Sequence, residues 1–214
     1  TPLDSSAASD VYKRQGDHPK DTLFALKTLV KELHQRNIFT IVVGGEQENT
    51  LGMFRGLSGM NTYVNLTSID ARFDFGEPGV LVSDDSYMSN IITEKPNNLK
   101  QFTNLGYQSY YISQEELDLM QKLFFDAYRL GDIAADLHES EPILRDTDIL
   151  SVDLSSVKAS ELDDPKGLPN GFDGAQICKL MRYAGLSDRL SVLGVFNISS
   201  SLRADQLLAQ MIWY

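Results

Sequence analysis

The first regular pattern in the chain is a series of apolar residues at helical spacing between Pro19 and Arg36. Lysine and glutamate fill many of the positions between these apolar residues, which are Leu23, Leu26, Val30 and Leu33. A short apolar run over 40–43 follows and is closed by Gly44 and Gly45, which suits a buried strand that ends in a tight backbone turn. The pattern therefore predicts an amphipathic helix followed by a strand.

Strand and helix patterns alternate along the rest of the chain. Runs rich in β-branched and other apolar residues predict strands over 63–69, 90–93, 106–112, 147–153 and 190–196. A capping box at Ser113 and Glu116 opens a helix closed by Gly131, and further helices are predicted over 174–184 and from Arg203 onward. Such alternation predicts an α/β fold with three layers, in which helices cover both faces of a mostly parallel sheet.

A candidate site lies at one edge of this predicted sheet. In parallel sheets, ligands bind beyond the carboxyl ends of the strands. Three polar segments directly follow predicted strands, over 44–47, 70–74 and 153–155. The irregular stretch over 155–172 is the longest in the chain, and we expect it to form the rim of the site rather than a domain boundary.

The two ends of the sequence differ from the body of the domain. Residues 1–15 lack a periodic apolar pattern, and the run over 10–15 resembles the translated end of a transposon adaptor used in DNA library preparation. At the other end an apolar run stops at Tyr214 without a glycine, a proline or a basic last turn. We therefore expect residues 1–15 to be a non-native tail and residues 16–214 to be a partial domain, truncated at both ends.

Composition excludes several classes of protein. With 214 residues, of which 42% are hydrophobic, the chain can bury the core of one sizeable domain. The formal net charge is -11 and no basic run occurs, which argues against nucleic acid or a membrane surface as a partner. No stretch is apolar enough to span a membrane, the N-terminal residues lack the apolar core of a secretory signal, and we expect a cytoplasmic protein. The single cysteine, Cys178, and the three widely spaced histidines offer no metal-ligand spacing.

The three polar segments carry motifs of a known family. They read Gly44-Gly45-Glu46-Gln47, Asp70-Ala71-Arg72-Phe73-Asp74 and Ser151-Val152-Asp153-Leu154-Ser155. In order, spacing and strand context they are similar to the signatures Gly-Gly-Asp-His, Asp-Ala-His-x-Asp and Ser-x-Asp-x-Asp of the ureohydrolases, which include arginase, agmatinase and formimidoylglutamase. The chain resembles the formimidoylglutamase-like branch most, over most of residues 16–214, and this implies an arginase-like fold.

The resemblance also implies a site for two metal ions. In the family the motifs hold a pair of Mn²⁺ ions, which activate a water for hydrolysis of a linear amidine or guanidine. Half of the implied ligands differ in this chain: Asp70, Asp74 and Asp153 are retained, whereas Gln47, Arg72 and Ser155 replace two histidines and one aspartate. Near the last strand, Asn197 stands where the family has a glutamate that binds the substrate.

Arg72 is the decisive difference from the family. Its guanidinium stays protonated, offers only hydrogen-bond donors and repels a metal cation. Residues 70, 72 and 74 would share one side of an extended segment. We therefore expect Arg72 to lie between Asp70, Asp74 and Asp153 as a fixed cation that replaces the metal pair. A guanidinium farther than ~4 Å from all three carboxylates would contradict this hypothesis.

Two functions stay open. One is a ureohydrolase-like protein with an incomplete metal site, catalytically impaired or non-catalytic, which binds a small amidine, guanidine or amino-acid-like ligand and holds no metal or one weakly bound ion. The other is a C–N hydrolase of a linear amidine or guanidine whose single metal ion is held by Asp70, Asp74 and Asp153, with Glu46 or Gln47 assisting. We favour the first, because family membership and activity are separate properties. The resemblance also implies a homo-oligomer.

Overall fold

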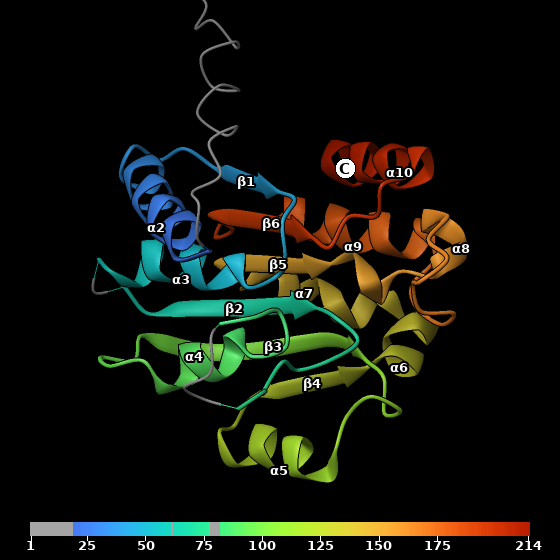
Figure 1. Ribbon diagram of the computed structural model, residues 1–214, viewed down its shortest axis with the longest axis horizontal. Coiled ribbons are helices and arrows are strands. Elements are labelled where there is room, and N and C mark those ends of the chain that lie inside the picture. The colour runs from blue at the N-terminus through green and yellow to red at the C-terminus, as the bar shows by residue number, and fades with distance from the viewer. Residues whose placement is uncertain (1–18, 61, 78–81) are drawn as a thin grey trace, which may run out of the picture.

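In the part of the chain that the structure describes, six parallel strands form one sheet (Figure 1). This computed structural model describes residues 19–60, 62–77 and 82–214, so the predicted non-native tail at 1–15 lies outside the described residues. The strands are β1 (Thr40–Val43), β2 (Val64–Ile69), β3 (Leu99–Tyr107), β4 (Asp126–Arg129), β5 (Ile149–Asp153) and β6 (Val192–Phe196). They lie in the order β1-β6-β5-β2-β3-β4, and each neighbouring pair is parallel.

Helices cover both faces of this sheet (Figure 1). They are α2 (Pro19–Gln35), α3 (Asn49–Ser58), α4 (Tyr87–Thr93), α5 (Gln114–Lys122), α6 (Leu130–Ala135), α7 (Ser140–Arg145), α8 (Ala159–Leu162), α9 (Gly174–Gly185) and α10 (Leu202–Trp213), with 3-10 turns η1 (Leu137–Glu139) and η2 (Leu154–Ser156). One hydrophobic cluster joins α2, α3 and α4 to the sheet, and a second joins α6, α7, α9 and α10 to it. The predicted three-layer α/β fold is confirmed. Within the described ranges, none of the helices combines the length and apolarity that crossing a lipid bilayer requires.

The central strands are covered on both of their faces, and β6 and most of β5 are apolar. Every residue of β2, β5 and β6 is buried. Strands in this position need continuous apolar runs rather than an alternation of polar and apolar residues. The runs over 147–153 and 190–196 therefore predicted β5 and β6 correctly, within two residues at their starts.

Helix α3 was not predicted, because two glycines weaken its helical pattern. A Cβ at Gly56 would lie 2.7 Å from Cγ1 of Val30, and a Cβ at Gly52 would lie 3.1 Å from Cδ2 of Leu26. Val30 and Leu26 both belong to α2, so the glycines allow the two helices to approach closely. Glycine lowers the helix propensity at these two positions. The close packing of α2 against α3 compensates for the lost stability.

Three predictions of secondary structure between 90 and 131 are wrong. Residues 90–93 belong to α4, since the β-branched residues there pack a helix into the core instead of pairing with a strand. The strand predicted over 106–112 starts earlier, at Leu99, and ends at Tyr107. The helix predicted between Ser113 and Gly131 divides into α5, β4 and α6, because Phe124 adopts a left-handed backbone with φ of 56° that ends the first helix.

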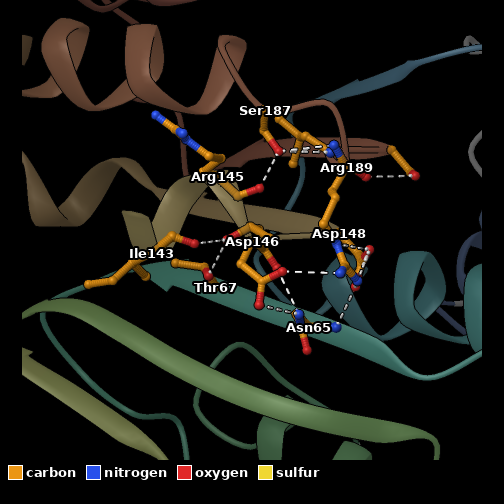
Figure 2. Close-up of polar contacts among 11 residues, drawn as sticks. Asn65, Thr67, Ile143, Arg145, Asp146, Asp148, Ser187 and Arg189 are labelled. Carbon is orange, nitrogen blue, oxygen red and sulfur yellow. Dashed lines mark hydrogen bonds and ion pairs between the residues drawn. The ribbon is translucent and has the colours of Figure 1, made fainter. Parts of the chain in front are cut away.

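A polar network joins the starts of the three central strands, on the edge opposite the candidate site (Figure 2). The guanidinium of Arg189 lies 3.1 Å from a carboxylate oxygen of Asp146 and 3.1 Å from one of Asp148. The backbone N–H of Asn65 donates to Asp148 at 2.8 Å, and the Asn65 amide donates to the backbone oxygen of Asp146 at 2.7 Å. These bonds link Asn65, near the start of β2, to the segments that lead into β5 and β6.

Candidate functional site

A cavity of about 310 Å³ lies beyond the carboxyl ends of β1, β2, β5 and β6. All seven residues that the motifs single out line it, namely Gln47, Asp70, Arg72, Asp74, Asp153, Ser155 and Asn197. Residues 164 and 166–168 from the long irregular stretch also line it, as expected for a rim. The parallel sheet thus brings together segments that are far apart in the sequence.

The first motif forms the turn that brings Gln47 into this cavity. Gly44 and Gly45 have φ of 91° and 77°, a left-handed backbone that favours glycine. The N–H of Gly44 donates to the backbone oxygen of Val195 at 2.9 Å, and the Gly45 oxygen accepts from the N–H of Asn197 at 3.0 Å. The turn is therefore held against the end of β6. The amide of Gln47 is 1% exposed and donates to the hydroxyls of two serines on β2 and β5.

Arg72 does not lie between the three carboxylates, so the hypothesis that it replaces the metal pair as a clamp is wrong. Its side chain is exposed, and its guanidinium carbon lies 4.8 Å from the centroid of the Tyr111 ring. Over residues 19–60, 62–77 and 82–214, no carboxylate oxygen comes within 4.0 Å of its side-chain nitrogens. Arg72 nevertheless contributes to the lining of the cavity.

The segment over 70–74 fails to alternate because it bends instead of continuing the strand. Oδ1 of Asp70 accepts a hydrogen bond from the backbone N–H of Arg72 at 2.8 Å, which turns the chain within two residues. The amide of Asn104 donates to the backbone oxygen of Arg72 at 2.7 Å. Asp74 has a left-handed backbone with φ of 56°. Asp70 and Asp74 consequently point into the interior while the Arg72 side chain points outward.

Asp153 has both of its oxygens occupied by Ser155. The backbone N–H of Ser155 donates to Oδ1 and its hydroxyl donates to Oδ2, each at 2.7 Å. Ser155 stands at a position where the resemblance implies a ligand aspartate. Its hydroxyl thus binds the neighbouring carboxylate and offers that carboxylate a neutral donor.

Asp70 and Asp74 both have a buried carboxylate oxygen without a hydrogen-bond partner. The Asp70 and Asp74 side chains are 1% and 7% exposed, and Oδ2 of each has no hydrogen-bonding atom among the described residues. Burial and the charge of Asp153 raise the pKa of Asp70 from 3.8 to about 7. Burial and the charge of Asp70 raise the pKa of Asp74 well above its ordinary value.

Three further residues that line the cavity are absent from the motifs, and a buried tyrosine outside the lining is influenced by the motif carboxylates. Asp84, Asp85 and Lys166 line it, and the fully buried Tyr87 has its pKa raised well above its usual range by burial and by the charges of Asp74 and Asp70. Lys166 lies in the stretch that the sequence marks as a rim, which was its only signal. The position of Tyr87 depends on the fold of α4, a helix that the sequence pattern did not predict.

Glu46 is not placed to assist at this site. Its side chain is exposed and is not part of the cavity lining. Burial and the charges of Glu46 and Asp84 raise the pKa of the half-buried Glu48 to about 7. Across the described ranges, moreover, no three His, Cys, Asp or Glu side chains are arranged so that they could hold one metal ion.

Comparison with known proteins gives consistent matches. The family model described as "Arginase family" matches residues 3–159. The fold is similar to Trypanosoma cruzi formiminoglutamase solved with Mn²⁺, with a TM-score of 0.82 and 14% identity over 93% of this chain and 71% of that one. Formimidoylglutamase from Bacillus subtilis gives a TM-score of 0.80 and 13% identity over 92% and 67% of the two chains. Entamoeba histolytica arginase in complex with L-ornithine gives 0.73 and 18%, over 89% and 73%. No curated protein matches the sequence.

Proposed function

The chain belongs to the arginase family, and from that premise we propose that it is a ureohydrolase-like protein whose site for two metal ions is incomplete. In this proposal the protein is catalytically impaired or non-catalytic. It binds a small amidine, guanidine or amino-acid-like ligand in the cavity beyond the sheet. The cytoplasmic location and the homo-oligomer stay predictions.

The observation that carries this proposal is the set of donors around the cavity. Two closely spaced dications need several carboxylates and imidazoles that share and offset their charge. Here Arg72 offers only donors and keeps its positive charge, and the hydroxyl of Ser155 is bound to Asp153. The described residues therefore do not fit a pair of manganese ions, and we derive no catalytic step through such a pair.

The test is metal binding together with turnover. The purified protein is exposed to Mn²⁺, its bound metal is measured after gel filtration, and hydrolysis of N-formimino-L-glutamate and of agmatine is assayed. We expect less than one ion per chain and no hydrolysis that a chelator abolishes. Two tightly bound ions with chelator-sensitive hydrolysis would overturn the proposal.

A double variant tests whether the replaced ligands are the cause of weak metal binding. Arg72→His with Ser155→Asp restores two of the implied ligands, and we expect it to bind Mn²⁺ more tightly than the wild type does. The control makes the same two changes on exposed helix positions, as Arg182→His with Ser160→Asp, and should leave metal binding unchanged. Equal affinity in both double variants would show that the missing ligands are not what limits binding.

A hydrolase with a single metal ion is the second candidate. The unpartnered oxygens of Asp70 and Asp74 favour it, because a divalent cation would satisfy both. The exposed position of Glu46 removes one of the groups that would assist such a site. One bound ion per chain with hydrolysis in the assay above would select this candidate.

A further inference from the structure

A second cavity, of about 530 Å³, lies between α9 and α10 and next to α8 (Figure 1). A Cβ at Gly174, where α9 starts, would lie 3.5 Å from Cδ1 of Leu207, and a Cβ at Gly185, where α9 ends, would lie 3.2 Å from the backbone oxygen of Tyr214. The two helices therefore run side by side in the same direction. Within the described ranges, the lining of this cavity shares no residue with that of the candidate site.

Cations outnumber carboxylates among the side chains that line this second cavity. Lys179 and Arg182 of α9 and Arg203 of α10 are cations, whereas Glu161 is the one carboxylate side chain in the described lining. Across the described residues, no carboxylate oxygen lies within 4.0 Å of the side-chain nitrogens of the three cations. The chain has a formal net charge of -11, so an unpaired group of cations is a local exception. Such an excess of positive charge in a concave site attracts anions.

The half of the cavity toward the ends of the two helices is rich in hydrogen-bond donors. Lys179 and Arg182 lie three positions apart on α9, a spacing that brings Cβ atoms to within about 5–6 Å of each other. The ammonium of Lys179 lies 5.7 Å from the centroid of the Tyr183 ring, which restricts this side chain without using its N–H donors. Gln206 and Gln210 line the wall formed by α10. A cation in the last turn of a helix also offsets the helix dipole, which accounts for Arg182 but not for Lys179.

A phosphate monoester matches these donors better than a carboxylate does. At neutral pH its phosphate carries a charge of about −1.5 to −2 and three strong acceptor oxygens. It can therefore accept from two cations and an amide at once, whereas a carboxylate brings one charge and two oxygens. The lining also contains apolar surface that suits an organic group, from Ala175, Cys178 and Leu207. A volume of about 530 Å³ is in the range of small-molecule sites and exceeds what inorganic phosphate would fill.

We propose that the cavity between α9 and α10 binds a small organic phosphate monoester. Its phosphate is held by Lys179, Arg182 and the amide of Gln206, and its organic part lies against Cys178 and Leu207. This site is independent of the proposed function, because neither a metal ion nor any residue of the three motifs takes part in it.

The first experiment measures the binding of phenyl phosphate, benzoate and inorganic phosphate to the full chain by calorimetry at pH 7.5. Phenyl phosphate and benzoate share a ring and differ in their anionic group, whereas inorganic phosphate lacks the ring. We expect phenyl phosphate to bind at least about 10-fold more tightly than benzoate, the effect of one charge-assisted hydrogen bond, and about 10-fold more tightly than inorganic phosphate, because the ring is buried. No binding of phenyl phosphate, or an affinity equal to that of either other probe, would overturn the proposal.

Alkylation of Cys178 locates the bound probe. Cys178 is the single cysteine of the chain, lines this cavity and is 7% exposed. Burial raises the pKa of its thiol, so the reaction is followed at pH 8.5 by mass spectrometry with the uncharged reagent iodoacetamide. We expect phenyl phosphate at ten times its Kd to slow the alkylation about 10-fold, since the probe and the reagent compete for one cavity. An unchanged rate with bound probe would place the probe elsewhere and reject the proposal.

Variants assign the donors. Lys179→Gln should weaken phenyl phosphate about 10-fold, whereas Lys122→Gln, which removes an exposed charge from the last turn of α5, should leave its affinity unchanged. Gln206→Glu places a second carboxylate in the lining and should abolish the protection of Cys178. Its control is Gln121→Glu at an exposed position of α5, which should leave the protection intact. Unchanged binding in Lys179→Gln, or equal losses in a variant and its control, would reject a specific phosphate site.

Discussion

Replacing Asp70 by asparagine removes a buried charge and keeps the shape of the side chain. Its Oδ1 can still accept the hydrogen bond from the N–H of Arg72, which is 2.8 Å long in the wild type. The side chain is 1% exposed, so solvent does not screen the change. Asp70→Asn therefore measures the free energy that burying the ionised Asp70 carboxylate costs the folded protein.

The magnitude follows from the raised pKa of Asp70. Because the pKa is higher in the folded state, about 7 against an ordinary 3.8, the group favours folding below pH 3.8 and this contribution is lost as the pH rises to about 7. At about 1.4 kcal/mol per pKa unit, the cost at pH 8 is at most ~4 kcal/mol, and coupling to Asp74 and Asp153 lowers it. We expect Asp70→Asn to raise the free energy of unfolding by ~2–4 kcal/mol at pH 8 and by little at pH 4.

The assay is urea unfolding at pH 4, 6 and 8 with a chelator present. Asp136→Asn is the matched control, because Oδ1 of Asp136 accepts from the N–H two residues on at 3.0 Å but the side chain is exposed. We expect no pH-dependent gain in that variant. A gain for Asp70→Asn that is the same at pH 4 and pH 8, or a loss of stability at pH 8, would refute the reasoning.

Two further predictions concern stability away from the cavity. Gly56→Ala should destabilise the protein by about 1–3 kcal/mol in urea unfolding, because the new Cβ would lie 2.7 Å from Val30; Gly131→Ala, whose Cβ would meet nothing within 4 Å, is the control, and equal effects would contradict the packing argument. Arg189→Gln should cost about 1 kcal/mol at low salt and less at 1 M salt, since its ion pairs are partly exposed. Arg182→Gln should cost nothing, and a loss for Arg189→Gln that salt does not reduce would rule out an electrostatic origin.

The sequence predicted the layers of the fold because buried parallel strands leave a local signal. The runs that became β5 and β6 are mostly apolar since both faces of these strands are covered, and the apolar run of β1 belongs to an edge strand that is only partly buried. Helix α3 left no such signal. Gly52 and Gly56 lower its helix propensity. They stabilise the fold only through the close packing of α2 against them.

What the sequence determined by itself is the place and the chemical inventory of the site. The order of the three motifs put the site at the carboxyl edge of the sheet, and the identities of Arg72 and Ser155 fixed which donors and charges are available there. Only the tertiary structure decided where these groups point. Arg72 faces Tyr111 rather than the carboxylates because the chain bends at Asp70, and Lys166 joins the cavity through the fold of its loop. Charge and donor type belong to a residue, whereas its direction depends on contacts with residues distant in the sequence.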